Sequence, residues 1–350
     1  MKVWHGIYNK LITKQNIVNG YNEFLKGKKS KKDVIRFQKE QYKNLELLRL
    51  LLEDKTYKPG AYSQFIVQDP KTRIIHKANV KDRIVHHIVS DFLEDIFEKT
   101  FIEHSYSCRD DKGTHRGVLA LQKMCLKESR NNTRTCWILK CDISKFFASI
   151  NHKVLLEILA KKVGDQEFME LLRKIIDGFY SDKTANLSNK KGVPIGNLTS
   201  QFFSNIYLNE LDQFVKHRLK VTYYLRYADD FVFVSANKDY LLSLIPSLQL
   251  FLKNELDLNL HPKKVILGKL SNGVDFLGYI VFPNHILPRT TTKKRMIRKI
   301  KESIREFKSG KITEKSLNQT IQSYYGVLTH ANSYKFKREL QNLIWFWLTE

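Results

Sequence analysis

Two adjacent carboxylates lie at the centre of residues 223–234, and their type and spacing could support a chemical function. Asp229 and Asp230 lie between two runs of aromatic and β-branched residues, which predicts a β-hairpin with the acids in its turn. Carboxylates among apolar residues are costly to bury without a partner, and neighbouring negative charges repel each other. Because divalent cations relieve both problems, we expect a cation site at this turn.

A third carboxylate, Asp142, ends an apolar run over residues 136–143 that reads as a buried strand. Taken alone, it is more readily a helix cap or a loop residue than a metal ligand. If its strand neighbours the hairpin in an antiparallel sheet, all three acids meet at one edge. Three carboxylates can hold two Mg²⁺ ions, with Mn²⁺ as a substitute. Two ions about 3.5–4 Å apart stabilise the attacking and leaving oxygens of phosphoryl transfer.

The charge of the chain indicates a polyanionic partner. Its 350 residues hold 60 Lys and Arg against 36 acidic residues, which gives a net charge of +24. A basic but unspecialised surface is the alternative. The 12% of aromatic residues favours nucleic acid, because aromatic rings stack on bases while cations neutralise phosphates.

Several other classes of protein are disfavoured. The four cysteines lack zinc-ligand spacing, so we expect reduced, mostly buried thiols in a cytoplasmic protein. No run approaches the ~20 apolar residues of a membrane span, and we expect neither secretion nor membrane association. No Walker A loop and no evident Ser/His/Asp or Cys/His arrangement is present.

The sequence of the first third of the chain predicts helices before and after one β-hairpin. We expect helices over 8–26, over 31–53 with a capping box at Ser30–Asp33, and over 80–98, where His86 and His87 are structural. A hairpin over 61–68 and 73–78 turns at 69–72 and places Lys71 at its tip and Arg73 after it. Arg73 could hold phosphate or could be an ordinary surface residue.

The remaining elements follow from periodicity and from Pro and Gly. Thr114 is the expected N-cap of a helix over 115–130, after a polar, basic loop. Pro246 predicts a kink or restart in its helix. The other expected elements are helices from about 151, over 165–179, 198–219 and 238–254, a loop over 181–197, strands over 256–268 and 274–282, and helices over 290–308, 313–329 and 334–348.

Five stretches, in family order, resemble motifs of reverse transcriptases. Residues 227–230 resemble the catalytic box, and the other matches surround it. They are residues 142–147 (first aspartate motif), 194–201 (template- and nucleotide-positioning loop), 258–264 (lysine motif) and 275–279 (primer-grip hairpin). A lone Ala-Asp-Asp would be weak evidence for this family. Five motifs in the family's order, spanning most of residues 60–285, are specific evidence for it.

The resemblance implies roles by position. Asp142 and Asp229 would be the main metal ligands, Asp230 would assist, and the Ile143 carbonyl would complete a metal shell. Lys264 would donate a proton to the departing pyrophosphate.

The resemblance also implies a nucleotide pocket. Phe147 would screen the sugar 2′ position and favour deoxynucleotides, while Lys71 and Arg73 would hold the triphosphate. The other implied residues are Lys145, Phe146, Ile195, Gly196 and Gln201 in the pocket, and Phe276, Leu277, Gly278 and Tyr279 in the primer grip.

One residue makes the chain more similar to one branch of this family than to the others. Many reverse transcriptases carry Gln immediately before the Gly that is Gly196 here, whereas this chain carries Ile195, as in the diversity-generating retroelement branch. Residues 82–87, 112–116 and 329–334 are also similar to that branch. The resemblance implies a bacterial or phage-encoded enzyme that copies a template-repeat RNA with frequent errors opposite adenine. A small, basic, helical accessory protein would assist it.

We therefore expect an α+β right-hand polymerase fold. The N-terminal helices and fingers would cover 1–104, the palm 105–288 with an inserted fingers segment at about 150–190, and a helical basic thumb 289–350. The palm would combine an antiparallel sheet with helices. We expect no RNase H, endonuclease or zinc-finger domain in these residues.

The expected function is Mg²⁺-dependent, RNA-directed DNA synthesis from deoxynucleoside triphosphates on an RNA template, through an RNA/DNA hybrid. Two alternatives stay open. One is a bacterial antiphage-defence reverse transcriptase of another group, and the other is a maturase-like RNA-binding protein with a vestigial site. The presence of all three acids disfavours the second.

Overall fold

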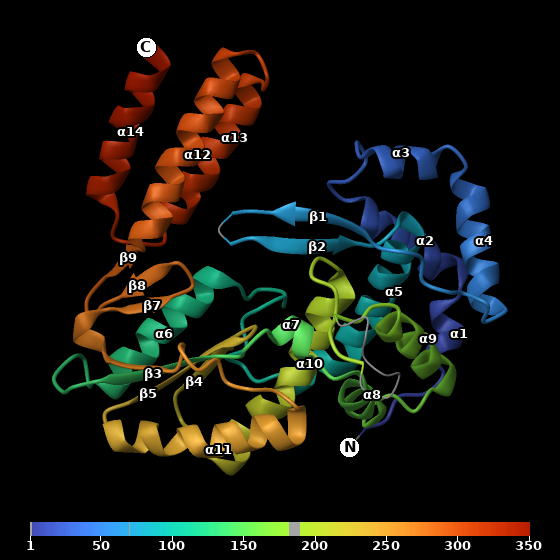
Figure 1. Ribbon diagram of the computed structural model, residues 1–350, viewed down its shortest axis with the longest axis horizontal. Coiled ribbons are helices and arrows are strands. Elements are labelled where there is room, and N and C mark those ends of the chain that lie inside the picture. The colour runs from blue at the N-terminus through green and yellow to red at the C-terminus, as the bar shows by residue number, and fades with distance from the viewer. Residues whose placement is uncertain (1, 70, 182–189) are drawn as a thin grey trace.

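The structure is a computed structural model that describes residues 2–69, 71–181 and 190–350. It combines many helices with antiparallel sheets, so the expected α+β class is confirmed. Part of the expected turn at 69–72 and part of the loop at 181–197 lie outside the described residues. Figure 1 shows a helical N-terminal lobe, a central sheet and three C-terminal helices standing beside one another.

Five helices and one hairpin form the N-terminal lobe. They are α1 (Ile7–Leu11), α2 (Lys14–Leu25), α3 (Lys32–Gln38), α4 (Gln41–Glu53), β1 (Ser63–Val67), β2 (Arg73–Lys77) and α5 (Val80–Phe97), followed by the short helix η1 (Glu98–Thr100). The hairpin and α5 confirm the sequence prediction. Figure 1 shows the β1–β2 hairpin extending from this lobe toward the C-terminal helices.

Two predicted helices of this lobe are each divided in two. The helix expected over 8–26 breaks where the side chain of Thr13 caps α2 by accepting a hydrogen bond from the Asn16 N–H. The helix expected over 31–53 breaks between α3 and α4. The predicted capping box at Ser30–Asp33 is wrong, because α3 begins after Lys31 without a side-chain cap. Asp33 instead forms ion pairs with Lys77 and Arg83.

The central region carries a four-stranded antiparallel sheet in the order β4-β5-β3-β6. Its strands are β3 (Trp137–Asp142), β4 (Tyr224–Tyr227), β5 (Asp230–Ser235) and β6 (Ile266–Lys269). The surrounding helices are α6 (Thr114–Glu128), α7 (Phe146–Ser149), α8 (His152–Ala160), α9 (Gln166–Asp177), α10 (Leu198–Gln213), the π-helical turn η3 (Phe214–Arg218) and α11 (Lys238–Leu256).

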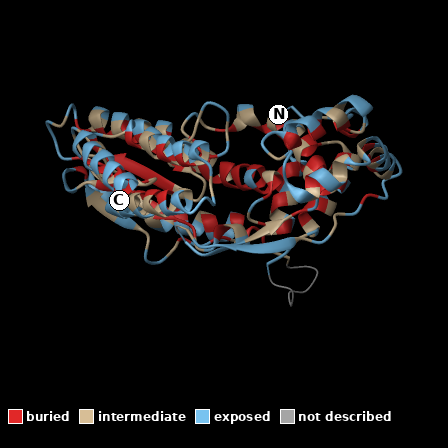
Figure 2. Cartoon of the chain, turned by 90° about the horizontal axis from the view of Figure 1, so that it is seen from above, coloured by how far each residue is buried: buried red, intermediate tan, exposed pale blue. Residues whose placement is uncertain are grey.

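Alternating side chains divide the central sheet between two hydrophobic cores. Leu139 and Phe231 pack with α10 and α11 in the larger core. Ile138 and Val232 face α6 and a second, three-stranded sheet. That sheet consists of β7 (Val274–Phe276), β8 (Tyr279–Val281) and β9 (Ile286–Pro288), with the short helix η4 (Leu270–Asn272) before it. Figure 2 shows the buried segments in red inside an elongated molecule.

Four predictions in the central region need correction. Gly113, not Thr114, is the N-cap of α6, and the Thr114 hydroxyl donates to the Tyr227 hydroxyl instead. The helix α11 continues through Pro246, so of the expected kink or restart, the restart does not occur. Only Ile266–Lys269 of the strand expected over 256–268 is β-structure. The strand expected over 274–282 is the β7–β8 hairpin, turned by positive φ angles at Leu277 and Gly278.

The C-terminal helices match their predicted ranges and pack around their own core. They are α12 (Thr290–Lys308), α13 (Glu314–Leu328) and α14 (Tyr334–Thr349). The bundle is attached to the second sheet where the Tyr279 hydroxyl donates to the Val327 carbonyl at 2.9 Å. At the same junction, His115 of α6 stacks on His330 with 3.6 Å between ring centroids. Residues 112–116 and 329–334, which resemble one branch of the family, therefore meet here.

Two further observations bear on the sequence predictions. Of the four cysteines, Cys125, Cys136 and Cys141 are buried and Cys108 is exposed, and all four are free thiols as expected. Within the described residues, no helix is both long and apolar enough to cross a membrane.

His86 of α5 predicts a loss of stability in acid. Its ring is 2% exposed, and neither ring nitrogen has a hydrogen-bond partner among the described residues. Burial, with the nearby His87 and Arg83 charges, lowers the pKa of His86 to about 3. Since the unfolded pKa is about 6.5, the contribution of His86 to stability is fully present above that pH and falls as pH drops toward 3, by about 1.4 kcal/mol per pH unit.

His86→Leu should therefore reduce the dependence of the free energy of unfolding on pH between about 6.5 and 4, measured by urea denaturation at several pH values. The same replacement at exposed His217 is the matched control. An unchanged slope in His86→Leu would contradict a neutral, buried imidazole.

Candidate active site

The strand register brings the predicted carboxylates together. On the β3–β5 pair, Asp142 lies directly opposite Asp230, so the two side chains share one face at the same end of the sheet. Asp229 precedes Asp230 in the turn that joins β4 to β5. The sequence prediction that Asp142 neighbours the acidic hairpin is confirmed.

A positive φ of 51° at Ala228 shapes this turn, and a buried arginine supports it from behind. Arg226 is fully buried, and its guanidinium forms a bidentate ion pair with the equally buried Asp212 at 2.6 and 2.8 Å. A further guanidinium N–H donates to the Ala228 carbonyl at 3.2 Å. The backbone that presents Asp229 is therefore tied directly to helix α10.

Other buried groups complete the contacts around this ion pair. The Tyr224 hydroxyl donates to Asp212 at 2.7 Å, and the guanidinium also donates to Asn205 and to the Ser105 hydroxyl. The sequence prediction missed this support. The available signal was Arg226 itself, a cation inside an otherwise apolar and aromatic strand, which has to find a buried partner.

The three carboxylates repel one another, and nearby lysines compensate only part of their charge. Burial raises the pKa of Asp229 to about 6, and the negative charge of Asp142 adds to the effect. Two lysines offset part of this charge. The ammonium of Lys264 contacts both Asp142 oxygens at 2.8 and 2.9 Å, and that of Lys140 lies 3.6 Å from Asp230.

The donor set fits a hard divalent cation, because carboxylate oxygens are the ligands that Mg²⁺ prefers. Within the described ranges, no three acidic, His or Cys side chains are already arranged around one point. Asp142 is instead turned to Lys264. A cation here would therefore have to replace the Lys264 ammonium as the counter-charge of Asp142.

Backbone contacts link two of the stretches expected to bind nucleotide. The half-buried Phe147 lies in α7, and its carbonyl accepts a hydrogen bond from the Val193 N–H at 2.8 Å. His152, which begins α8, contacts the Gly192 carbonyl at 2.7 Å. The loop over 190–197 is therefore fixed against the segment that follows Asp142.

The same loop touches the β1–β2 hairpin. The Ile195 carbonyl accepts a hydrogen bond from the His76 N–H of β2 at 3.1 Å. Gly196 has a φ of 114°, and a Cβ there would lie 2.7 Å from the Ile75 side chain. This close approach requires glycine. Ile195 and Gly196 are thus placed between the hairpin and the segment holding Phe147.

The remaining predicted pocket residues divide into exposed polar side chains and buried apolar ones. Lys71 and Arg73 are exposed at and after the hairpin tip, Lys145 is exposed with a φ of 46°, and Gln201 is exposed in the first turn of α10. Phe146 is buried and packs edge-on against Phe147 at 5.5 Å. Ile143 is buried and pairs with Leu260.

The predicted primer-grip residues form the tip of the β7–β8 hairpin. Phe276 and Tyr279 are buried, and Leu277 and Gly278 make the turn. This turn borders a cavity of about 570 Å³ that is also lined by Arg289, Arg295 and Arg298 of the following segment and α12. Across this cavity, Arg298 pairs with Asp69 of the β1–β2 hairpin at 3.0 Å. The cavity is therefore basic and lies between the hairpin and the C-terminal helices.

Comparison with known proteins now adds to the geometry. Residues 58–281 match the family described as reverse transcriptase (RNA-dependent DNA polymerase). Protein YkfC of Escherichia coli is 26% identical over 269 residues, which cover 67% of this chain and 70% of YkfC. The group II intron-encoded protein LtrA of Lactococcus lactis is 24% identical over 336 residues, covering 77% of this chain and 52% of LtrA.

A similar solved structure is the apo telomerase of Candida tropicalis. It has a TM-score of 0.51 and 13% identity, and the match covers 83% of this chain and 62% of the telomerase chain. At this identity the likeness concerns the fold alone, and it agrees with the expected polymerase fold. The chain spans only about half of LtrA and about three fifths of the telomerase chain.

Proposed function

The chain belongs to the reverse transcriptase family, and from this membership we propose that it synthesises DNA on an RNA template. The observation that carries the proposal is the register of Asp142 opposite Asp230, beside the Asp229 turn. The net charge of +24 supports a nucleic-acid substrate bound mainly through phosphates.

We propose that Asp142, Asp229, Asp230 and the Ile143 carbonyl hold two Mg²⁺ ions. When bound, the ions would activate the primer 3′-hydroxyl as the attacking group and would neutralise the charge of the leaving pyrophosphate. Lys264, released from Asp142, would then be free to donate a proton to the pyrophosphate. Lys71 and Arg73 would hold the triphosphate from the hairpin, because lysine and arginine both bind phosphate oxygens.

The chain would divide as a right hand. Residues 1–104 would provide the N-terminal helices and fingers, 105–288 the palm with its inserted segment, and 289–350 the thumb. The basic cavity beside Leu277 and Gly278 supports this division, because residues of the β1–β2 hairpin, of the β7–β8 turn and of α12 all line it.

The experiment is primer extension on a defined RNA with deoxynucleoside triphosphates and Mg²⁺. We expect cDNA that depends on the RNA template and on the added cation. Failure of the folded chain to extend any primer would overturn the proposal.

Phe147 is proposed to exclude ribonucleotides by contact with the sugar 2′ position. Phe147→Ala should reduce the preference for deoxynucleotides, measured as the ratio of kcat/KM values, by about a hundredfold, the scale on which a pocket excludes one hydroxyl. Phe147→Tyr keeps the ring and is the matched control, expected to retain the preference. If the ratio of kcat/KM values for deoxynucleotides and ribonucleotides were the same in Phe147→Ala and in the unmodified enzyme, Phe147 would not have this role.

We further propose that the enzyme is the error-prone polymerase of a diversity-generating retroelement. Ile195, together with residues 82–87, 112–116 and 329–334, supports this narrower assignment by resemblance. In that setting the cDNA would rewrite a variable gene, and a small, basic, helical accessory protein would be a partner.

Ile195→Gln tests whether this position relaxes fidelity. An amide at residue 195 would add a hydrogen-bond donor beside the nascent base pair, and a net hydrogen bond contributes about 1 kcal/mol. We expect misincorporation opposite template adenine to fall about fivefold, scored by sequencing cDNA made on a defined RNA. Leu198→Gln, three residues along, is the matched control. Unchanged errors at adenine in Ile195→Gln would count against the role.

A second candidate function is that of a group II intron-type reverse transcriptase or maturase. The similarity to LtrA over 77% of the chain favours it. A role in antiphage defence also remains a candidate on the same catalytic site. A template and variable repeat pair beside the gene, with a small accessory gene, would favour diversification.

A further inference from the structure

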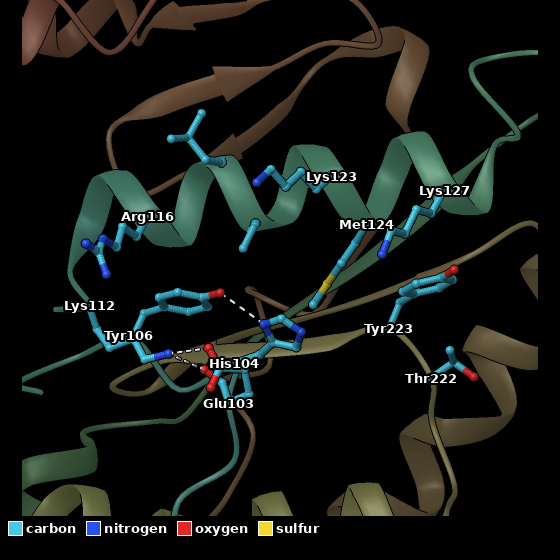
Figure 3. A pocket seen from close by; sticks show the side chains of 12 residues that line it. Glu103, His104, Tyr106, Lys112, Arg116, Lys123, Met124, Lys127, Thr222 and Tyr223 are labelled. Atoms are coloured by element: carbon cyan, nitrogen blue, oxygen red, sulfur yellow. Dashed lines mark hydrogen bonds and ion pairs between the residues drawn. The ribbon is translucent and has the colours of Figure 1, made fainter.

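A groove on the outer side of α6 lies apart from the carboxylate turn. It has a volume of about 470 Å³ and is bounded by α6, by residues 103–106 and by Thr222 and Tyr223, which immediately precede β4. Figure 3 shows Arg116, Lys123 and Lys127 along α6, with Tyr106, His104 and Tyr223 on the other side of the groove. We call this feature the α6 groove.

The charge of the α6 groove favours an anionic ligand. Arg116, Lys123 and Lys127 follow one another at spacings of seven and four residues, so they share one face of the helix, and all three are exposed. Two further cations of the groove are already paired, Lys112 with Glu103 and Arg116 with Asp111. No carboxylate in the described part of the chain is within ion-pair distance of Lys123 or Lys127. Two cations are thus available to phosphates.

Apolar and aromatic surface lies between these cations. Leu119 is 41% exposed and Tyr223 is half-buried. Tyr106 is held rigidly, because its hydroxyl lies 3.0 Å from the His104 ring nitrogen and its ring stacks on that imidazole. Unpaired bases expose faces that pack on such surface, whereas the bases of a duplex are stacked on one another. The groove therefore suits an unpaired strand.

The position of the groove connects it to the catalytic turn. At the start of α6, the Thr114 hydroxyl contacts the Tyr227 hydroxyl at 3.3 Å, and Tyr227 is two residues before Asp229. Tyr223, at the other end of the groove, lies one strand length away, about 13 Å along β4. A strand leaving the catalytic turn over α6 would meet Arg116 first and Lys123 and Lys127 further on.

We propose that the α6 groove binds an unpaired segment of the template RNA, outside the duplex held at the catalytic turn. Lys123 and Lys127 bind its phosphates, and Leu119 and Tyr223 contact its bases. The proposal rests on the proposed function, since it names a second contact for the same RNA.

The test compares a charge-reversed pair with a matched pair elsewhere. Lys123→Glu with Lys127→Glu removes two phosphate contacts, and Lys153→Glu with Lys253→Glu makes the same charge change at exposed positions on α8 and α11. Binding of an unpaired, fluorescently labelled RNA oligomer is measured over a series of salt concentrations. For the groove variant, the slope of log K against log salt should fall in magnitude by about 1.4, at about 0.7 per phosphate contact.

Primer extension on a hybrid with a minimal template overhang separates this proposal from the proposed function. We expect the groove variant and the unmodified enzyme to extend it equally, while the groove variant loses extension on a long unpaired template. Crosslinking of thiouridine-substituted RNA should map to Tyr223. Three results would each overturn the proposed RNA site: an unchanged salt slope in the groove variant, crosslinks that map only to residues outside the groove, or an equal loss of extension by the groove variant on the short hybrid. Absence of extension by the unmodified enzyme would instead overturn the proposed function.

Discussion

Replacing Asp229 with Asn should abolish DNA synthesis while leaving the fold intact. The change removes one negative charge from a half-buried turn beside Asp142, and it keeps the shape of the side chain. If Asp229 is a main ligand of the catalytic cations, loss of about 4 kcal/mol of transition-state stabilisation corresponds to about three orders of magnitude in rate. The measurement is single-turnover primer extension on an RNA template.

The matched control for this experiment is Asp239→Asn. Asp239 is an exposed carboxylate in the first turn of α11, and the same replacement there should leave the rate unchanged. Circular dichroism and thermal melting of both variants confirm folding. If Asp229→Asn polymerised at the rate of the unmodified chain, the assignment of the carboxylates as metal ligands would be wrong.

Replacing Asp212 with Ala should strongly destabilise the protein. It would leave the Arg226 guanidinium, which is 0% exposed, without its ion-pair partner and remove the acceptor of the Tyr224 hydroxyl. Breaking a buried pair in this way costs about 3–5 kcal/mol of unfolding free energy. Urea denaturation measures the loss. Glu210→Gln, which breaks the more exposed pair with Lys161, is the control and should have little effect.

A paired replacement distinguishes an effect on stability from an effect on the position of the Asp229 turn. Asp212→Leu with Arg226→Met replaces both charges by apolar groups, which often restores stability. It also removes the donor that holds the Ala228 carbonyl at 3.2 Å. We expect this variant to recover most of the unfolding free energy but to keep a reduced kcat. Full recovery of both quantities would mean that Arg226 has only a structural role.

The arrangement of the three carboxylates was predictable from sequence because it depends on strands with clear hydrophobic patterns. The apolar run ending in Asp142 and the aromatic hairpin around Asp229 each identify a strand, and antiparallel pairing then fixes the meeting of Asp142 with Asp230. The C-terminal helices were predictable for a similar reason, since their hydrophobic periodicity is regular and each helix begins and ends within one residue of its predicted range.

The features that the sequence did not predict depend on tertiary contacts or on local caps that compete with helical periodicity. Helix ends near Thr13 and Lys31 are decided by local capping and by the ion pairs of Asp33. Residues 256–265 have strand-like composition but lie outside the sheet, where the His261 N–H donates to the Asp142 carbonyl. The partnership of Arg226 with Asp212 and the α6 groove join residues far apart in sequence, which periodicity does not reveal.

Primer extension on a defined RNA by the unmodified chain and by Asp229→Asn, with Mg²⁺ present or chelated, is the most direct test of RNA-templated DNA synthesis at this site. We predict cDNA only from the unmodified chain, only with the RNA template, and only when the cation is present. A folded, RNA-binding chain that makes no cDNA, or cDNA made equally well by Asp229→Asn, would contradict it.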